Sequence, residues 1–243
     1  MTAIETKNLT KKYKNKLAVN SLNLKIEKGE LFALLGVNGA GKTTTIKMLT
    51  GLVSPTSGDA ILLGDSIISN PRTVKSKINV SPQETAVAPN LTVRENLELV
   101  ACIYGFDRSA AGKKADEMLE AFDLGEVSKD RAKTLSGGMQ RRLSIAMALI
   151  SNPQILFLDE PTLGLDVIAR RELWTAIRKL KGNITIILTT HYMEEAEALS
   201  DRIGIMAKGN LKAFGTAAAL MAETNTRTLE EAFISLAAQK EAV

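Results

Sequence analysis

The stretch LFALLGVNGAGKT, residues 31–43, decides the fold that we expect for this chain. Its first five residues are all apolar, and a short apolar run of this kind is typical of a buried strand. The residues that follow match the pattern Gly-x-x-x-x-Gly-Lys-Thr, in which the backbone turns from a strand into a helix around phosphate groups. We expect that helix over residues 42–51, ending at Gly51. The stretch therefore predicts an α/β fold that binds a nucleotide.

Each residue type in this loop has a chemical reason to be there. The glycines let successive backbone N–H groups turn toward the phosphates, and Lys42 supplies a positive charge to the outer ones. The hydroxyl of Thr43 suits Mg²⁺, and that of Thr44 can reach an inner phosphate. The alternative is a glycine turn without a ligand, which the flanking strand and helix disfavour. The residues expected to contact the nucleotide are Gly36, Asn38, Gly39, Ala40, Gly41, Lys42, Thr43 and Thr44.

A second apolar run, residues 155–158, ends in the acids Asp159 and Glu160. Carboxylates at the C-terminal end of a buried strand lie where open α/β sheets bind their ligands. We expect Asp159 to bind Mg²⁺ through water. Glu160, pointing the other way along the pleat, would polarise an attacking water, and such general-base help contributes about 10²–10⁴ in rate. Paired acids after a strand can also cap a helix, but the phosphate loop upstream favours the catalytic role.

Three single residues are further candidates for the same site. The only histidine, His191, follows a predicted strand at 184–190 and can donate to a γ-phosphate or hold the attacking water. Gln83 follows the short run 78–81, and its amide can contact both Mg²⁺ and water. Tyr13 offers its ring to an adenine base, and such stacking is worth about 1–3 kcal/mol per base. Taken singly, each of the three is more typical of a structural or surface residue.

Residues 135–140, LSGGMQ, place a second pair of glycines at the start of a predicted apolar helix. Backbone N–H groups at a helix start are donors for phosphate. The alternative is a helix N-cap without a ligand, for which Ser136 is a preferred residue type. One small domain is not expected to fold two such sets of donors around one nucleotide. Ser136, Gly137 and Gly138 therefore suggest a site shared between two copies of the chain.

The bulk composition is that of an ordinary globular protein. The chain has 243 residues, of which 45% are hydrophobic and 24% charged, and this argues against disorder. Lys and Arg number 31 against 27 Asp and Glu with the signs interspersed, so we expect no nucleic-acid partner. The single Cys102 excludes an intramolecular disulfide and is expected to pack in the core. No secretory signal or apolar run of roughly 20 residues is visible, which predicts a cytoplasmic chain.

The pattern along the chain predicts an α/β core with a helical insertion. Apolar and polar residues roughly alternate over residues 4–26, which predicts antiparallel strands joined at Lys14–Asn15. Helical spacing then dominates three segments, 93–103, 110–122 and 137–150. Strand and helix patterns alternate in the later segments 155–158, 167–180, 184–189, 193–199 and 203–206. The insertion covers about residues 88–152, and a last helix is expected over 228–238.

In this order along the chain, the motifs resemble those of the nucleotide-binding subunit of ABC transporters over nearly the whole sequence. Residues 36–44 resemble its Walker A loop, and residues 135–140 its signature. Residues 155–160 resemble Walker B with the catalytic glutamate, and residues 163–166 the D-loop, which ends in Asp166. Each motif is weak alone, but together in the family's order they are a strong signal.

The three single residues complete the resemblance. Gln83 is similar to the Q-loop glutamine, His191 to the switch histidine and Tyr13 to the A-loop aromatic residue. The resemblance implies a P-loop NTPase (RecA-like) core with an antiparallel β subdomain and an inserted α-helical subdomain. Residues 1–222 would form this ATPase domain, and residues 223–243 a short helical extension.

The resemblance also implies a head-to-tail dimer, expected to be a homodimer, that holds two ATP molecules between its subunits. Ser136, Gly137 and Gly138 of one copy would contact the γ-phosphate bound by Lys42 of the other, which is electrostatic stabilisation from across an interface. ATP would close the dimer, and hydrolysis would let it open. Asp166 joins the nucleotide-contacting set. The catalytic residues would be Glu160, His191, Gln83 and Lys42, and those for Mg²⁺ Thr43, Gln83 and Asp159.

Several details resemble the exporter branch of the family, which serves drugs, ions and lipids. They are Met139 in the signature, Leu163 in the D-loop, the segments 190–197 and 228–233, and an end of the chain soon after the core. We therefore expect ATP-driven transport, with export as the direction, through a separate membrane permease. A groove formed by residues 87–104 would receive a permease helix, although the apolar residues of this segment are equally consistent with the core of the insertion. The chain would lie at the inner face of the membrane. The alternative is a cytosolic ABC ATPase that assembles or remodels a soluble complex.

Overall fold

The computed structural model describes residues 1–238, which form two compact units. The first unit contains Met1–Ser76 and the part of the chain that begins at Lys181, and the second is Lys77–Leu180. We describe each unit by itself. None of the helices in the described part of the chain is long and apolar enough to cross a membrane.

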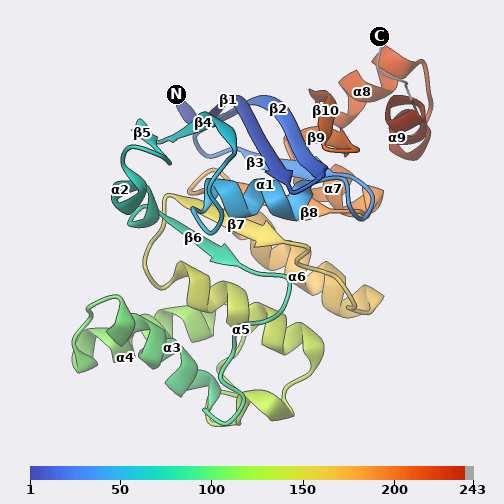
Figure 1. Ribbon diagram of the computed structural model, residues 1–243. Helices are drawn as coiled ribbons and strands as arrows, with labels where there is room; N and C mark the ends of the chain where they lie inside the picture. The colour runs from blue at the N-terminus through green and yellow to red at the C-terminus, as the bar shows by residue number, and fades with distance from the viewer. Residues whose placement is uncertain (239–243) are drawn as a thin grey trace. The chain divides into compact units, whose positions relative to one another are not determined.

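The first unit begins with an antiparallel sheet in the order β2-β1-β4-β5 (Figure 1). Its strands are β1 (Thr2–Tyr13), β2 (Lys16–Glu27), β4 (Ser57–Leu62) and β5 (Asp65–Ser66). The predicted turn at residues 14–15 joins β1 to β2, and Lys14 takes a positive φ of 45° there. In β2, Leu22, Leu24 and Ile26 are buried and the residues between them are exposed, as an antiparallel sheet with one covered face requires, whereas register shifts interrupt this alternation along β1.

A second group of strands in this unit has the order β10-β9-β3-β8. It consists of β3 (Leu31–Leu35), β8 (Thr185–Thr190), β9 (Arg202–Ala207) and β10 (Asn210–Gly215). β3 runs parallel to β8 and β9, and every residue of β3 and β8 is buried, which explains their continuous apolar runs. The helices of this unit are α1 (Lys42–Leu49), α2 (Pro71–Lys75), α7 (Met193–Leu199), α8 (Ala217–Thr224) and α9 (Leu229–Ala238).

The second unit combines two parallel strands with a group of helices. β6 (Ile78–Ser81) pairs with β7 (Ile155–Asp159), so that Ser81 lies opposite Leu158. The helices are α3 (Val93–Ile103), α4 (Arg108–Ala121), the 3₁₀ turn η1 (Ala132–Thr134), α5 (Gly137–Leu149) and α6 (Val167–Leu180). Figure 1 shows α3, α4 and α5 grouped together, and their core includes the fully buried Leu97, Phe122 and Leu143.

Most predicted elements are found within one or two residues of their expected bounds, but the sequence analysis missed α2, β5, η1, β10 and α8. The residues of β10 are half-buried except for the exposed Phe214, so they show no clear alternation. The expectation that Cys102 packs in the core is wrong, because the residue is exposed. Its neighbour Ala101 occupies the buried face of α3, and the next residue is turned about 100° away from that face.

The predicted domain boundaries, 1–222 with an insertion at about 88–152 and an extension at 223–243, stay predictions. The last five residues of that extension, 239–243, lie outside the described residues.

Candidate nucleotide site

The phosphate loop lies in the first unit, between β3 and α1. The N–H of Gly36 donates to the carbonyl of Thr190 at 3.2 Å, which ties the start of the loop to the end of β8. A Cβ at Gly36 would lie 2.6 Å from the carbonyl oxygen of Met206, and one at Gly41 would lie 2.5 Å from that of Ala18. The loop therefore has room only for glycine at these two positions, and Gly41 also has a φ of 109°.

The end of the loop presents a lysine and an uncapped helix start. Lys42 is buried, with 4% of its surface exposed, and its Nζ donates to the carbonyl of Gly36 at 2.7 Å. α1 begins after Gly41 without a side-chain cap. Glycine has no side chain with which to cap a helix, and a helix start of this kind is a suitable place for an anion.

His191 and Tyr13 belong to the same unit as the loop. His191 directly follows β8, and the bond from Gly36 to Thr190 places it beside the beginning of the loop. Its ring centroid lies 4.1 Å from that of Tyr192. Tyr13 is the last residue of β1, is 42% exposed, and has the Nζ of Lys11 5.0 Å from its ring centroid.

The acid pair lies in the second unit, at the end of β7. Asp159 and Glu160 are 5% and 7% exposed. The strand ends at Asp159, and Glu160 has a φ of 49°, which L residues rarely adopt. The expectation that Glu160 follows the alternation of the pleat is therefore wrong, since the residue is not in the strand. Strained backbone of this kind is concentrated at functional sites.

The signature segment forms the N-terminus of α5 in this unit. The hydroxyl of Ser136 accepts a hydrogen bond from the N–H of Met139 at 3.3 Å, so the residue is the N-cap that the sequence allowed. Ser136 and Gly137 are exposed. A Cβ at Gly138 would lie 2.9 Å from the Cβ of Ala169, so this glycine permits the close approach of α5 and α6.

Gln83 and Asp166 occupy loops of the second unit. Gln83 is exposed and lies two residues beyond the end of β6. The carboxylate of Asp166 accepts a hydrogen bond from the N–H of Ala169 at 2.9 Å at the start of α6. Asp166 therefore caps α6, in addition to the nucleotide contact that we expect of it.

One residue that the sequence analysis did not single out links several of these loops. Arg141, on α5, is only 4% exposed, and its guanidinium donates to backbone carbonyls that include those of Gln83 and Glu160. The sequence contained one signal that Arg141 is buried, namely its spacing from buried residues of the same helix. Arg141 lies three residues after Gly138 and four before Ile145, both of which are buried, so it occupies the buried face of the helix.

The residues expected to hold Mg²⁺ have suitable chemistry but come from both units. Thr43 supplies a hydroxyl, Gln83 an amide oxygen and Asp159 a carboxylate, and such hard oxygen donors suit Mg²⁺, which keeps several waters of its own. Among the described residues, no three His, Cys, Asp or Glu side chains gather into a metal site.

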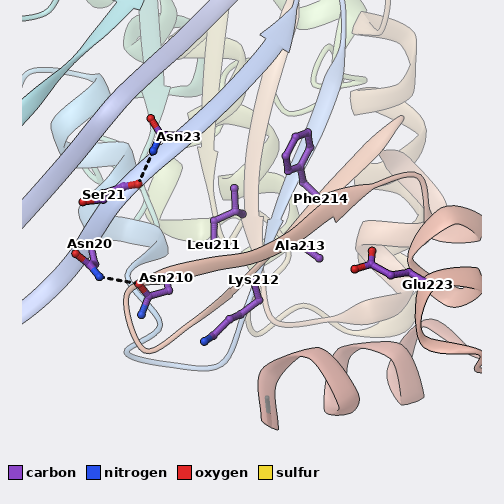
Figure 2. A pocket seen from close by; sticks show the side chains of 9 residues that line it. All are labelled: Asn20, Ser21, Asn23, Asn210, Leu211, Lys212, Ala213, Phe214 and Glu223. Atoms are coloured by element: carbon purple, nitrogen blue, oxygen red, sulfur yellow. Dashed lines mark hydrogen bonds between the residues drawn. The ribbon is translucent and has the colours of Figure 1, made fainter. Parts of the chain in front are cut away.

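A polar pocket of about 530 Å³ lies elsewhere in the first unit (Figure 2). A hydrogen bond of 2.9 Å from Asn20 on β2 to Asn210 on β10 joins two of its lining residues (Figure 2). It contains none of the predicted site residues. Its lining consists of Asn20, Ser21, Asn23, Asn210, Leu211, Lys212, Ala213, Phe214 and Glu223.

Each unit thus brings together part of the predicted set. The first unit gathers the phosphate loop, Lys42, Thr43 and His191. The second gathers the acid pair, Gln83 and the signature around α5.

Comparison with known proteins identifies the family. The family model described as ABC transporter matches residues 19–163, more than half of the chain. The chain belongs to the ABC transporter family. It is an ABC-type ATPase, and the predicted family and enzyme class are confirmed.

Several curated proteins are similar to this ABC ATPase. The linearmycin resistance ATP-binding protein LnrL of Bacillus subtilis is 41% identical over 233 residues, which are 96% of this chain and 75% of LnrL. The daunorubicin/doxorubicin resistance ATP-binding protein DrrA of Streptomyces peucetius is 40% identical, over 93% of this chain and 69% of DrrA. The phospholipid-transporting ATPase ABCA3 of Homo sapiens is 43% identical over 89% of this chain, but the chain spans only 13% of that protein.

Solved structures confirm the P-loop NTPase fold of this ABC ATPase. The structure of an ATP-binding subunit of an ABC transporter matches with a TM-score of 0.85 at 29% identity, over 97% of this chain and 99% of that one. The dimeric, post-hydrolysis structure of the ATP-binding cassette MJ0796 with ADP and Pi matches with a TM-score of 0.79 at 28% identity, over 88% and 98% of the two chains.

Proposed function

We propose that this ABC ATPase hydrolyses ATP as a head-to-tail homodimer and drives export through a separate integral-membrane permease. The observation that carries the proposal is the presence of two helix starts suited to phosphate. α1 begins without a side-chain cap beside the buried Lys42, and α5 begins at the exposed Ser136 and Gly137. The dimeric MJ0796 cassette with ADP and Pi supports an arrangement in which two copies share each nucleotide.

Each site residue has a defined part in this reaction. The loop N–H groups and Lys42 bind the phosphates of ATP, and Tyr13 stacks on its base. Thr43, Gln83 and Asp159 would hold Mg²⁺, which would neutralise charge on the phosphates. Glu160 polarises the attacking water, and His191 contacts the γ-phosphate. Ser136, Gly137 and Gly138 of the partner copy, with Asp166, complete the site around the developing charge.

An exposed apolar surface on α3 supports the permease as a partner. Leu99, Ile103 and Tyr104 are 46%, 72% and 47% exposed, within the segment 87–104 that we assign to the permease groove. Contiguous exposed apolar side chains are typical of interaction sites. The chain would therefore lie at the inner face of the cell membrane. Residues 1–222 would act as the ATPase domain and residues 223–243 as its extension.

The names of the relatives support the exporter direction. LnrL and DrrA are both described as resistance ATP-binding proteins. This chain spans only 13% of ABCA3 and 22% of ABC transporter A family member 2 of Arabidopsis thaliana. The transport activity and the permease partner are therefore part of the proposal. A soluble complex that co-purifies in place of a membrane protein would instead favour the cytosolic alternative.

The Glu160→Gln variant tests the proposed chemistry. It removes the carboxylate that polarises water but keeps the shape of the side chain, so we expect ATP turnover to fall by about 10²–10⁴. ATP should still bind, and an ATP-bound dimer should accumulate on a sizing column. Turnover at the parent rate would show that Glu160 is not the base. The Glu120→Gln variant, which makes the same change at an exposed position of α4, should keep the parent rate.

A further inference from the structure

The guanidinium of Arg141 contacts three backbone carbonyls from two loops of the second unit. Its Nη1 donates to the carbonyl of Pro82 at 2.5 Å. Its Nη2 donates to the carbonyl of Gln83 at 2.9 Å and to that of Glu160 at 2.8 Å. The same side chain thus joins the loop after β6 to the loop after β7, and it does so from the second turn of α5.

The burial of Arg141 makes these bonds significant. Only 4% of the residue is exposed, and buried arginine is rare unless it is well paired. Charge-assisted hydrogen bonds to neutral acceptors are stronger than ordinary ones, and a planar guanidinium directs its donors at fixed angles. A lysine would keep the charge but could not reproduce these angles.

Glu160 and Gln83 both need such support. The backbone of Glu160 has a φ of 49°, and a strained residue persists only where its surroundings restrain it. The bond from Arg141 to its carbonyl is one such restraint. Gln83 is exposed in a segment without regular secondary structure, and the bonds to Pro82 and Gln83 hold the first residues of that segment.

We propose that Arg141 is a positioning residue that holds the backbones of Glu160 and Gln83 in register with the signature helix α5. This inference rests on the proposed function, in which Glu160 polarises water and Ser136 contacts the partner's nucleotide. Ser136 caps the helix that carries Arg141, five residues before it. A contact at the start of α5 is thereby coupled to the placement of the base within the same subunit.

The first test separates positioning from binding. In the Arg141→Gln variant, we expect kcat for ATP to fall about 10- to 100-fold while KM changes by less than about threefold, since the phosphate loop is untouched. Arg141→Lys should recover part of kcat because it keeps the charge and some donors. Rates are normalised to the bound nucleotide per subunit, so that misfolded protein does not count. If Arg141→Gln does not fold, the kcat-against-KM comparison is made on Arg141→Lys.

Lys114→Gln is the control. Lys114 also pairs within the second unit, with Glu117, but its partner is a side chain of the same helix, α4, and not a loop of the site. Its kcat and KM should match the parent values. A parent kcat in the Arg141 variant, or an equal loss in both variants, would overturn the inference.

The double variant Arg141→Gln/Glu160→Gln shows whether Arg141 acts through Glu160. If it does, the loss of turnover in the double variant is smaller than the product of the two single losses, because no carboxylate remains to be positioned. Multiplied losses would overturn the inference. Parent turnover in Glu160→Gln alone would instead contradict the proposed function, so the two failures can be told apart.

Discussion

Gly137 and Gly138 are adjacent in the signature, but they have different structural roles. Gly138 lies against α6, and a Cβ there would be 2.9 Å from the Cβ of Ala169. A Cβ at Gly137 would lie 3.8 Å from Leu165, which is ordinary van der Waals contact. The space around the two residues, and not their backbone, therefore distinguishes them.

Replacing Gly138 should test this difference. We expect Gly138→Ala to lower the free energy of unfolding by about 1–3 kcal/mol, because α5 and α6 must move apart to admit the methyl group. Gly137→Ala is the matched control and should leave the free energy of unfolding unchanged or slightly raised. Urea denaturation measures both. A Gly138→Ala protein as stable as Gly137→Ala would mean that the helices adjust without cost.

At the scale of elements, α3 depends on a capping box at its N-terminus. The hydroxyl of Thr92 accepts from the N–H of Glu95 at 3.1 Å, and the carboxylate of Glu95 accepts from the N–H of Thr92 at 2.7 Å. The hydrogen bond from the backbone of Thr92 is the main cause that lowers the pKa of Glu95 from its ordinary value of 4.5. The exposed apolar surface proposed for the permease lies on the same helix.

The box should make the stability of α3 depend on pH. Because the folded-state pKa of Glu95 is lowered, its contribution is complete above the unfolded value of 4.5 and disappears as the pH falls through the folded value. We expect Glu95→Gln to be less stable than the parent at pH 7, with a difference that shrinks as the pH falls below 4.5. Thr92→Ala should cost about 0.5–2 kcal/mol at pH 7. Denaturation curves across this pH range provide the measurement, and a difference independent of pH would contradict the role of the charge.

At the scale of the whole molecule, the two helix starts that we propose to bind phosphate lead to a prediction about subunit mixing. Ser136→Arg should abolish turnover but leave ATP binding to a single copy largely intact, because the phosphate loop is unchanged. Lys42→Ala should abolish turnover through the loop itself. Mixed in equal amounts, the two inactive variants should recover roughly a quarter of the parent rate, since half of the dimers are mixed and each has one intact site. Recovery is measured as phosphate release after mixing.

The outcome distinguishes two arrangements of the site. If the signature completes the site of its own subunit, every copy in the mixture has one defect and no activity returns. The double variant Lys42→Ala/Ser136→Arg, mixed with either single variant, is the control, because none of the resulting dimers has an intact site.

Much of the fold was available from the sequence because it depends on local patterns. Residues 31–35 are apolar throughout and form a strand buried along its whole length, and the helix 167–180 has the bounds that its spacing predicts. β10 was missed because most of its residues are half-buried, and α8 because Leu220 is its only buried residue, so neither element shows a clear period. Cys102 was misplaced because one position around a helix decides between core and solvent.

The sequence by itself determined which residues belong to the candidate site. The phosphate loop, the strand that ends in two acids and the glycine pair after Ser136 are each recognised from particular side chains at fixed spacing. Only the tertiary structure decided that the carbonyls of Pro82, Gln83 and Glu160 are bound by one guanidinium. The physical reason is that a backbone carbonyl is the same in every residue. No pattern of side chains indicates which carbonyls a distant arginine will reach until the chain has folded.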